Sequence, residues 1–344
     1  MGYFFRFWAR VIRTALYIIY HRRLETRRAY ALLKEIEQKY GGRFSDPTRR
    51  KIAVSYGIYN PMMCDAFTAL HGRRTNAGEK ERFIHYFICS SLFDDFTDIT
   101  TLPETELLAL SFSPETFTPR SFDESVFRDS HLLLKDFVRE KVTYDSLTQK
   151  LFQAQWDSKK QARGAARPAD ALGGTHSGAA LSDDALREIT FRKGGLSVLL
   201  CSFYLDTTPS AAERDCWYRI GTIIQLTNDL FDIYKDLGDQ MDTLPLRMRD
   251  AAVFRLFFED QVKGMFAAVA ALGVPEGRKA PFRLFMAGIC AFGMIALDQL
   301  GELTPPFHGY TRAQLVIDME KRQNLAAWLR YTYRLAMPPL PSPS

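Results

Sequence analysis

The chain has 344 residues, of which 47% are hydrophobic, and its formal net charge is +5. This length and composition allow one large buried core or two smaller ones. The five cysteines show no C-x-x-C spacing, which is typical of a reduced, cytoplasmic protein with thiols in its core. The six histidines are not clustered, so neither a zinc site nor histidine-based nucleophilic catalysis is supported.

The positive charge is concentrated at the N-terminus. Residues 1–28 contain seven arginines and one glutamate, so the rest of the chain is close to neutral. A nucleic-acid-binding protein spreads its basic residues over the fold, and we therefore expect no nucleic-acid partner. The arginines interrupt the apolar residues too often for a membrane span or a signal peptide. We expect residues 1–30 to form a basic, aromatic helix that either rests peripherally on an anionic membrane or caps the fold.

Helical periodicity of the apolar residues dominates the chain, and Gly and Pro residues punctuate it. No run alternates like a half-buried strand, so we predict an all-α fold, a single large helical bundle with a central apolar cavity. Residues 31–337 form this domain, 163–182 a mobile loop ending in the helix cap at Ser182, and 338–344 a disordered tail. The predicted helices lie near residues 6–38, 48–71, 78–99, 122–141, 144–163, 183–205, 209–239, 248–271, 281–302 and 311–336.

A first acidic cluster follows the apolar run 83–93 and consists of Asp94, Asp95 and Asp98. Residues three or four apart share one face of a helix, so these carboxylates are expected to point the same way. A single acidic cluster at a helix end is equally typical of a solvated turn.

A second acidic cluster, Asn228, Asp229, Asp232 and Asp236, follows another apolar run. Asn228, Asp232 and Asp236 are spaced at i, i+4 and i+8, which predicts one stripe on a helix. Carboxylates flanked by Phe, Ile and Leu are costly to desolvate unless they are paired or bound to metal. Two such oxygen-rich clusters suit Mg²⁺ ions whose remaining ligands are water and phosphate oxygens. We therefore expect the cleft between the clusters to hold a diphosphate.

The segment Arg192-Lys193-Gly194-Gly195 lies inside a predicted helix. Each Gly costs about 1 kcal/mol relative to Ala in a helix interior, so the pair needs a local reason. One reason is a helix break that lets the backbone approach a ligand, with Lys193 beside it to hold an anion. The other is a kink at a packing contact.

These motifs resemble those of the class I terpenoid (isoprenoid diphosphate) synthase superfamily, over roughly residues 50–335. The first cluster matches the family's D-D-x-x-D motif in full. The second is similar to the N-D-x-x-S-x-x-K-E motif, with Asp232 in place of Ser and Asp236 in place of Glu. Both exchanges keep an oxygen ligand, so the resemblance implies a Mg²⁺ cofactor, three ions in number.

The resemblance also implies roles for other residues. A basic pair near the helix break, Lys235 and a C-terminal Arg-Tyr pair would bind the substrate diphosphate. The catalytic carboxylates and amide would be Asp94, Asp95, Asn228 and Asp232. The expected diphosphate-binding residues are Arg192, Lys193, Lys235, Arg330 and Tyr331, and those lining the substrate pocket are Phe87, Ser91, Gly194, Gly195, Gly221, Ile224 and Gln225.

Chain-elongating prenyltransferases of this superfamily add an Arg-Arg pair shortly after the first motif, and residues 99–106 contain no cation. Arg73 and Arg74 lie upstream and either substitute in part or form a solvated turn. We therefore expect a terpene synthase that ionises one allylic isoprenyl diphosphate of C15 to C25 and cyclises or rearranges the carbocation. The alternatives are an isoprenyl diphosphate synthase, a head-to-head prenyltransferase, and a non-catalytic membrane-associated protein that binds isoprenoids. A homodimer is compatible with this pattern.

Overall fold

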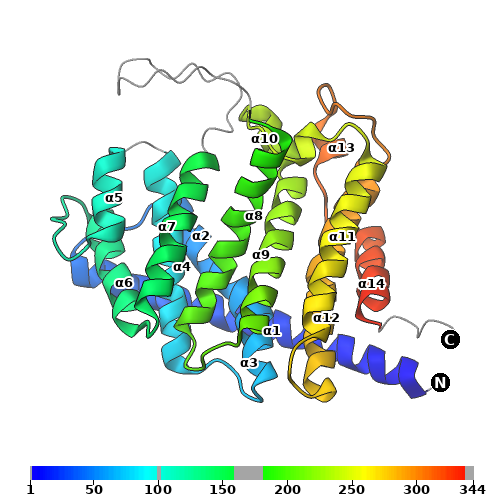
Figure 1. The fold of residues 1–344 in the computed structure, drawn as a ribbon, viewed down its shortest axis with the longest axis horizontal. Coiled ribbons are helices and arrows are strands. Elements are labelled where there is room, and N and C mark those ends of the chain that lie inside the picture. The colour runs from blue at the N-terminus through cyan, green and yellow to red at the C-terminus, as the bar shows by residue number, and fades with distance from the viewer. Residues whose placement is uncertain (1, 99–101, 159–180, 338–344) are drawn as a thin grey trace. The chain divides into compact units, whose positions relative to one another are not determined.

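The fold is taken from a computed structural model, which describes residues 2–98, 102–158 and 181–337 (Figure 1). The regular elements of these residues are helices, and none of them is a β-strand. The predicted all-α class is confirmed. The helices divide into two compact units, which are described separately below.

Unit 1 comprises residues 1–146, 200–208 and 274–285. Within it, α2 packs against both α1 and α4, and α4 also packs against α6. Its elements are α1 (Gly2–Tyr40), α2 (Asp46–Tyr59), a π-helical turn (Asn60–Cys64), α3 (Asp65–Leu70), α4 (Ala77–Asp98), α5 (Glu104–Phe112), α6 (Phe122–Phe137) and a 3-10 turn (Cys201–Tyr204).

Unit 2 comprises residues 147–199, 209–273 and 286–344, and α9 packs against α11 within it. The division between the units falls inside α7 (Lys141–Ser158) and α12 (Glu276–Leu300). The other elements of unit 2 are α8 (Asp183–Leu200), α9 (Ala211–Phe231), α10 (Ile233–Gly238), a 3-10 turn (Pro245–Arg247), α11 (Ala251–Ala270), α13 (Arg312–Leu315) and α14 (Arg322–Ala336).

The predicted helices differ from the observed ones in a few places. The helix α5 was not predicted, because prolines at 103, 114 and 119 made the whole segment read as a break. The helix predicted over 311–336 is wrong in its middle, where 316–321 separate α13 from α14. The N-terminal helix, predicted over 6–38, is α1 (Gly2–Tyr40) and agrees with the prediction. Most of the predicted mobile loop (163–180) and the predicted tail (338–344) lie outside the described residues.

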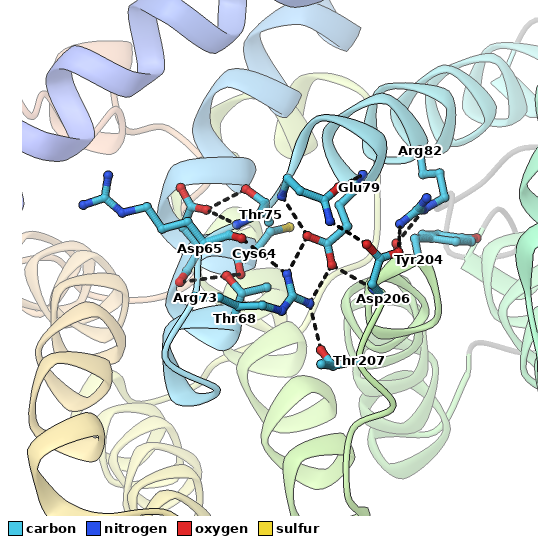
Figure 2. A network of polar contacts seen from close by, with 12 residues as sticks. Cys64, Asp65, Thr68, Arg73, Thr75, Glu79, Arg82, Tyr204, Asp206 and Thr207 are labelled. Atoms are coloured by element: carbon cyan, nitrogen blue, oxygen red, sulfur yellow. Dashed lines mark hydrogen bonds and ion pairs between the residues drawn. The ribbon is translucent and has the colours of Figure 1, made fainter.

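The start of α4 is anchored by Glu79, whose side chain is fully buried (Figure 2). Arg73 donates two hydrogen bonds of 2.7 Å to the two Glu79 carboxylate oxygens and a third, of 2.9 Å, to Thr207. The backbone N–H groups of Asn76 and Asp206 also donate to Glu79. A buried carboxylate is tolerated only when it is paired in this way. This network fixes the first turn of the helix that carries the first acidic cluster at its other end.

A second buried carboxylate, Glu25, ties α1 to α2 and α4. Lys80 Nζ lies 2.6 Å from Glu25 Oε1, and the Tyr56 hydroxyl donates a 2.6 Å hydrogen bond to Glu25 Oε2. Arg28 completes the cluster at 3.3 Å. The side chain of Glu25 is fully buried, so its negative charge is paired inside unit 1 and is not exposed on the outer face of α1.

In unit 2, the Gly194-Gly195 pair does not break the helix that contains it. The helix α8 runs without interruption from Asp183 to Leu200, so the predicted break is wrong. Instead, the pair lets α8 approach α9 (Figure 1). A Cβ atom on Gly194 would lie 2.5 Å from the Gly221 carbonyl oxygen, and one on Gly195 would lie 2.5 Å from the Tyr218 ring. The packing contact, which was the alternative explanation, accounts for both glycines.

All five cysteines lie in the described part of the chain, where they are buried and form no disulfide bond. Burial raises the pKa of every one of them, that of Cys216 to about 12. In the described part of the chain, one helix, α12, is long and apolar enough to cross a membrane by length and composition. The most apolar part of α12 is largely buried inside the protein, as in the core helix of a folded domain.

The α8–α9 contact leads to a stability prediction. Gly221→Ala would place a Cβ 2.4 Å from the Gly194 carbonyl oxygen and 2.8 Å from Val198 Cβ, so the helices must separate. We expect the free energy of unfolding to fall by about 1–3 kcal/mol, as for other overpacked contacts. Urea denaturation followed by circular dichroism measures this loss. Gly277→Ala, which meets no atom within 4 Å, is the matched control and should not destabilise. Equal stability of the two variants would contradict the close contact.

Candidate functional site

The first acidic cluster lies in the last turn of α4 in unit 1. The side chains of Asp94 and Asp95 are each 30% exposed. Lys51 on α2 places its Nζ 2.9 Å from Asp94 Oδ2 and 4.0 Å from Asp95 Oδ1. Thr48, one turn earlier on α2, donates a 2.6 Å hydrogen bond to Asp95 Oδ2. Asp98 ends the helix, and its side chain lies outside what the structure describes.

Asp123 at the start of α6 is a further carboxylate of this region that sequence reasoning missed. Burial, and next the negative charge of Asp95, raise its pKa. Its Oδ1 atom is buried and has no hydrogen-bond partner among the described residues. Lys51, Thr48 and Asp123 are at least 25 residues from the motif in sequence, so no local spacing could have identified them.

The second acidic cluster spans the junction of α9 and α10 in unit 2. Asp232 is the single residue between the two helices. Its backbone N–H still donates to the Asn228 carbonyl at 2.8 Å, and the Asp236 N–H donates to the Asp232 carbonyl at 2.8 Å. These i→i−4 bonds keep Asn228, Asp232 and Asp236 on the predicted stripe. Asn228 and Asp232 are exposed, whereas Asp236 is buried.

The negative charge of the carboxylates in the second cluster is not fully compensated by nearby positive charges and hydrogen-bond donors. Burial, and next the charges of Asp229 and Asp232, raise the pKa of Asp236 to about 7. Burial raises the pKa of Asp229 to about 6, against the opposing effects of a hydrogen bond from Gln225 and the charge of Lys193. Burial also raises the pKa of Asp232. Asp229 also lies in the last turn of α9, where the negative end of the helix dipole disfavours its carboxylate further.

Two of the predicted diphosphate-binding lysines lie close to this cluster. The charge of Lys193 on α8 acts on Asp229, and the charge of Lys235 acts on Asp232 and Asp236. Neither effect is strong enough to offset burial, since the pKa of each carboxylate remains raised. Arg192 is exposed and pairs with Glu188 at 2.5 Å.

The predicted Arg-Tyr pair on α14 is joined to a residue that sequence reasoning did not single out, Asp298 on α12. The Tyr331 hydroxyl lies 2.8 Å from both Asp298 carboxylate oxygens, and Arg330 lies 3.9 Å from Oδ2. Arg255 on α11 also donates to Asp298. Among the described residues, the contacts of this pair run to Asp298 and not to residues 228–236. Its role toward a diphosphate stays a prediction.

The predicted pocket residues are largely buried. Phe87 lies about two turns before Asp94 on α4, where its ring centroid is 5.5 Å from that of Tyr59 and 5.4 Å from that of Tyr86. Ser91, one turn closer to Asp94, is also buried. In unit 2, Gly194, Gly195 and Gly221 form the α8–α9 contact, and Ile224 and Gln225 are half-buried. Contact with a substrate stays a prediction for all of them.

The residues present fit a hard divalent cation at each cluster. No group of three or more His, Cys, Asp or Glu side chains converges into a closed metal site in the part of the chain that the structure describes. Mg²⁺ does not need such a cage, because it binds through one or two carboxylates and completes its shell with water and phosphate. The Lys51 ammonium beside Asp94 and Asp95 marks a position where positive charge is favourable. The raised pKa of Asp236 marks a shortage of positive charge in the second cluster.

Comparisons with known proteins give a likeness among solved structures. No protein-family model and no curated protein matches the chain. Among solved structures, the chain is similar to a dehydrosqualene synthase in complex with a ligand, with 14% identity and a TM-score of 0.39. The alignment covers 87% of this chain and 97% of that one. At this score the likeness adds nothing to the geometry described above.

The position of Lys51 leads to a prediction about metal binding. Lys51→Gln removes the ammonium from Asp94 and Asp95, so the two carboxylates repel each other unless a cation replaces it. We expect a small loss of stability without metal, about 1 kcal/mol or less for a partly exposed pair, and a larger Mg²⁺-induced rise in Tm than in the wild type. Calorimetry with and without about 5–10 mM Mg²⁺ measures both the loss of stability and the rise in Tm. Lys51→Arg, which keeps the charge, should behave like the wild type. The same response to Mg²⁺ in the wild type and Lys51→Gln would contradict this interpretation.

Proposed function

We propose that the chain is a Mg²⁺-dependent terpene synthase that ionises a linear allylic isoprenyl diphosphate, releases diphosphate, and cyclises or rearranges the resulting carbocation. The observation that carries this proposal is that Asp94, Asp95 and Asp229 lie in the last turns of α4 and α9, and that burial and like charge raise the pKa of Asp229 and Asp236. Carboxylates in such positions need cations, and the two motifs are those of isoprenoid diphosphate chemistry.

In this proposal, Asp94 and Asp95 supply oxygen ligands for Mg²⁺ at the first cluster, and Asp98 is expected to join them. Asn228, Asp232 and Asp236 supply oxygen ligands for Mg²⁺ at the second cluster. Bound Mg²⁺ would neutralise the charge that develops on the departing diphosphate. Lys193 and Lys235 would bind diphosphate oxygens as point charges, and this interaction strengthens as the C–O bond breaks.

In this proposal, the aromatic residues around Phe87 stabilise the allylic cation that ionisation leaves behind. An allylic cation must be kept from water and is stabilised by the faces of aromatic rings. Phe87 is seven residues before Asp94, so the two side chains lie on the same face of α4. Tyr59 and Tyr86 enlarge this aromatic surface. We therefore expect the hydrocarbon chain to lie along this face.

The chain's arginines favour a terpene synthase over an elongating prenyltransferase. No basic residue is present among residues 99–106, directly after Asp98. The upstream Arg73 is held by two hydrogen bonds to Glu79, and Arg74 lies with its guanidinium 4.5 Å from the centre of the Tyr17 ring. Because its guanidinium is already paired with Glu79, Arg73 is poorly suited to bind a second diphosphate.

The acidic motifs lead to the first functional prediction. Asp94→Ala and Asn228→Ala each remove an oxygen ligand, and we expect each to lower the rate of diphosphate release at least 100-fold, roughly the effect of losing an electrostatic partner of a transition state. Circular dichroism should show unchanged helix content. Titration with Mn²⁺ followed by electron paramagnetic resonance should show weaker metal binding.

The matched control for these variants is Asp184→Ala, which removes an exposed acid from the first turn of α8. Its turnover and metal binding should equal those of the wild type. Wild-type turnover in Asp94→Ala or Asn228→Ala would remove that residue from the site.

The missing basic pair leads to the second functional prediction. One allylic diphosphate should be sufficient as substrate, so incubation with a C15, C20 or C25 diphosphate and Mg²⁺ should give a hydrocarbon or alcohol by gas chromatography with mass spectrometry. A product that forms only when isopentenyl diphosphate is added would identify an elongating prenyltransferase. A C30 or longer product from two copies of one substrate would identify head-to-head condensation. Binding without diphosphate release would identify a non-catalytic isoprenoid-binding protein.

A further inference from the structure

The outer face of α1 exposes an unusual concentration of apolar side chains. Ile12, Leu16 and Ile19 are spaced at i, i+4 and i+7, so they share one face of the helix. Their side chains are 57%, 62% and 54% exposed, and the adjacent Tyr20 is 65% exposed. Of the twelve large hydrophobic side chains that are exposed in the described residues, five lie between residues 12 and 24. Contiguous exposed apolar surface of this kind marks an interaction site.

Positive charge surrounds this apolar face. Six arginines of α1 are exposed, and among them Arg13 and Arg23 flank the apolar side chains directly. The one acidic residue among residues 1–34, Glu25, is buried and paired with Lys80, so it does not offset this charge. The exposed arginines are Arg10, Arg13, Arg22, Arg23, Arg27 and Arg28.

We propose that this face of α1, residues 8–28, docks on the surface of an anionic lipid bilayer. Ile12, Leu16 and Ile19 enter the boundary between headgroups and acyl chains, and the arginines contact lipid phosphates. An interfacial helix needs this combination of an apolar face and basic flanks, whereas a spanning helix cannot contain so many charges. The proposal does not rest on the proposed catalytic function.

Other occupants of this face fit it less well. A second copy of the chain that paired through α1 would bring two sets of arginines together, and like charges across an interface are unfavourable. A nucleic acid would engage the arginines and leave the apolar side chains in water. An anionic bilayer satisfies both the charge and the apolar surface.

The test is co-sedimentation of the full-length protein with vesicles, without substrate or metal. One set contains phosphatidylglycerol and phosphatidylcholine in equal amounts, and the other contains phosphatidylcholine alone. We expect binding to the first set and little to the second, with a steep decrease as salt is raised. The substitution set Ile12→Ser, Leu16→Ser and Ile19→Ser should lower the partition coefficient at least tenfold, roughly the effect of losing three buried apolar groups.

Two control sets separate docking from general surface properties. Val142→Ser, Val253→Ser and Leu256→Ser remove more exposed apolar side chains from other helices, at 87%, 63% and 64% exposure, and should leave binding unchanged. Arg10→Gln, Arg13→Gln and Arg23→Gln should weaken binding roughly 100-fold, whereas the corresponding lysine substitutions should retain most of it. Circular dichroism and Tm values confirm that each variant is folded.

Three results would overturn the proposal. Equal binding to both vesicle sets would show that anionic lipid is not recognised. Unchanged binding by the Ile12, Leu16 and Ile19 variant, or equal loss in the Val142 control set, would place the membrane contact elsewhere. A dimer in lipid-free buffer that the α1 variant dissociates, measured by light scattering, would assign the face to a second copy of the chain.

Discussion

A carboxylate taken out of water needs a positive or hydrogen-bonding partner, and this requirement organises both units of the protein. Glu79 and Glu25 are fully buried, and each receives a basic side chain together with further hydrogen bonds. Such pairs hold helices in place, because removing one partner would leave a buried charge alone. At Asp229 and Asp236, burial raises the pKa and the nearby lysines do not offset it. The same physical rule therefore separates structural acids from those for which we propose a cation.

Helix geometry adds to this distinction. The structural acid Glu79 lies in the first turn of α4, where the helix dipole favours negative charge. Asp94 and Asp95 in α4 and Asp229 in α9 lie in last turns, where the dipole opposes it. The chain bends at Asp232, but two backbone hydrogen bonds are kept there. The Asp232 N–H donates to the Asn228 carbonyl, and the Asp236 N–H donates to the Asp232 carbonyl. The stripe of oxygen ligands thus continues across the bend. Holding like charges together at such positions has a cost in stability, which is typical of functional sites.

The long helices could be predicted from sequence because their apolar periodicity is a local signal. The α5 helix was missed because prolines stand on both sides of it, and the interruption between α13 and α14 has no strong breaker. Gly194 was placed correctly as a special position, but the sequence did not decide between a ligand and a neighbouring helix. Lys51 beside Asp94, and Asp298 beside Tyr331, were not found at all. They come from distant helices, and only the tertiary fold brings them to the motifs.

The burial of every cysteine has a practical consequence for studying α1. A thiol reacts as its thiolate, and burial both hides these five sulfurs and keeps them protonated. The folded protein is therefore expected to be nearly inert to maleimides without any change to its native residues. A single Leu16→Cys substitution would then introduce one accessible thiol on the outer face of α1. An environment-sensitive fluorophore attached there would report the polarity around that one position, in an otherwise unaltered chain.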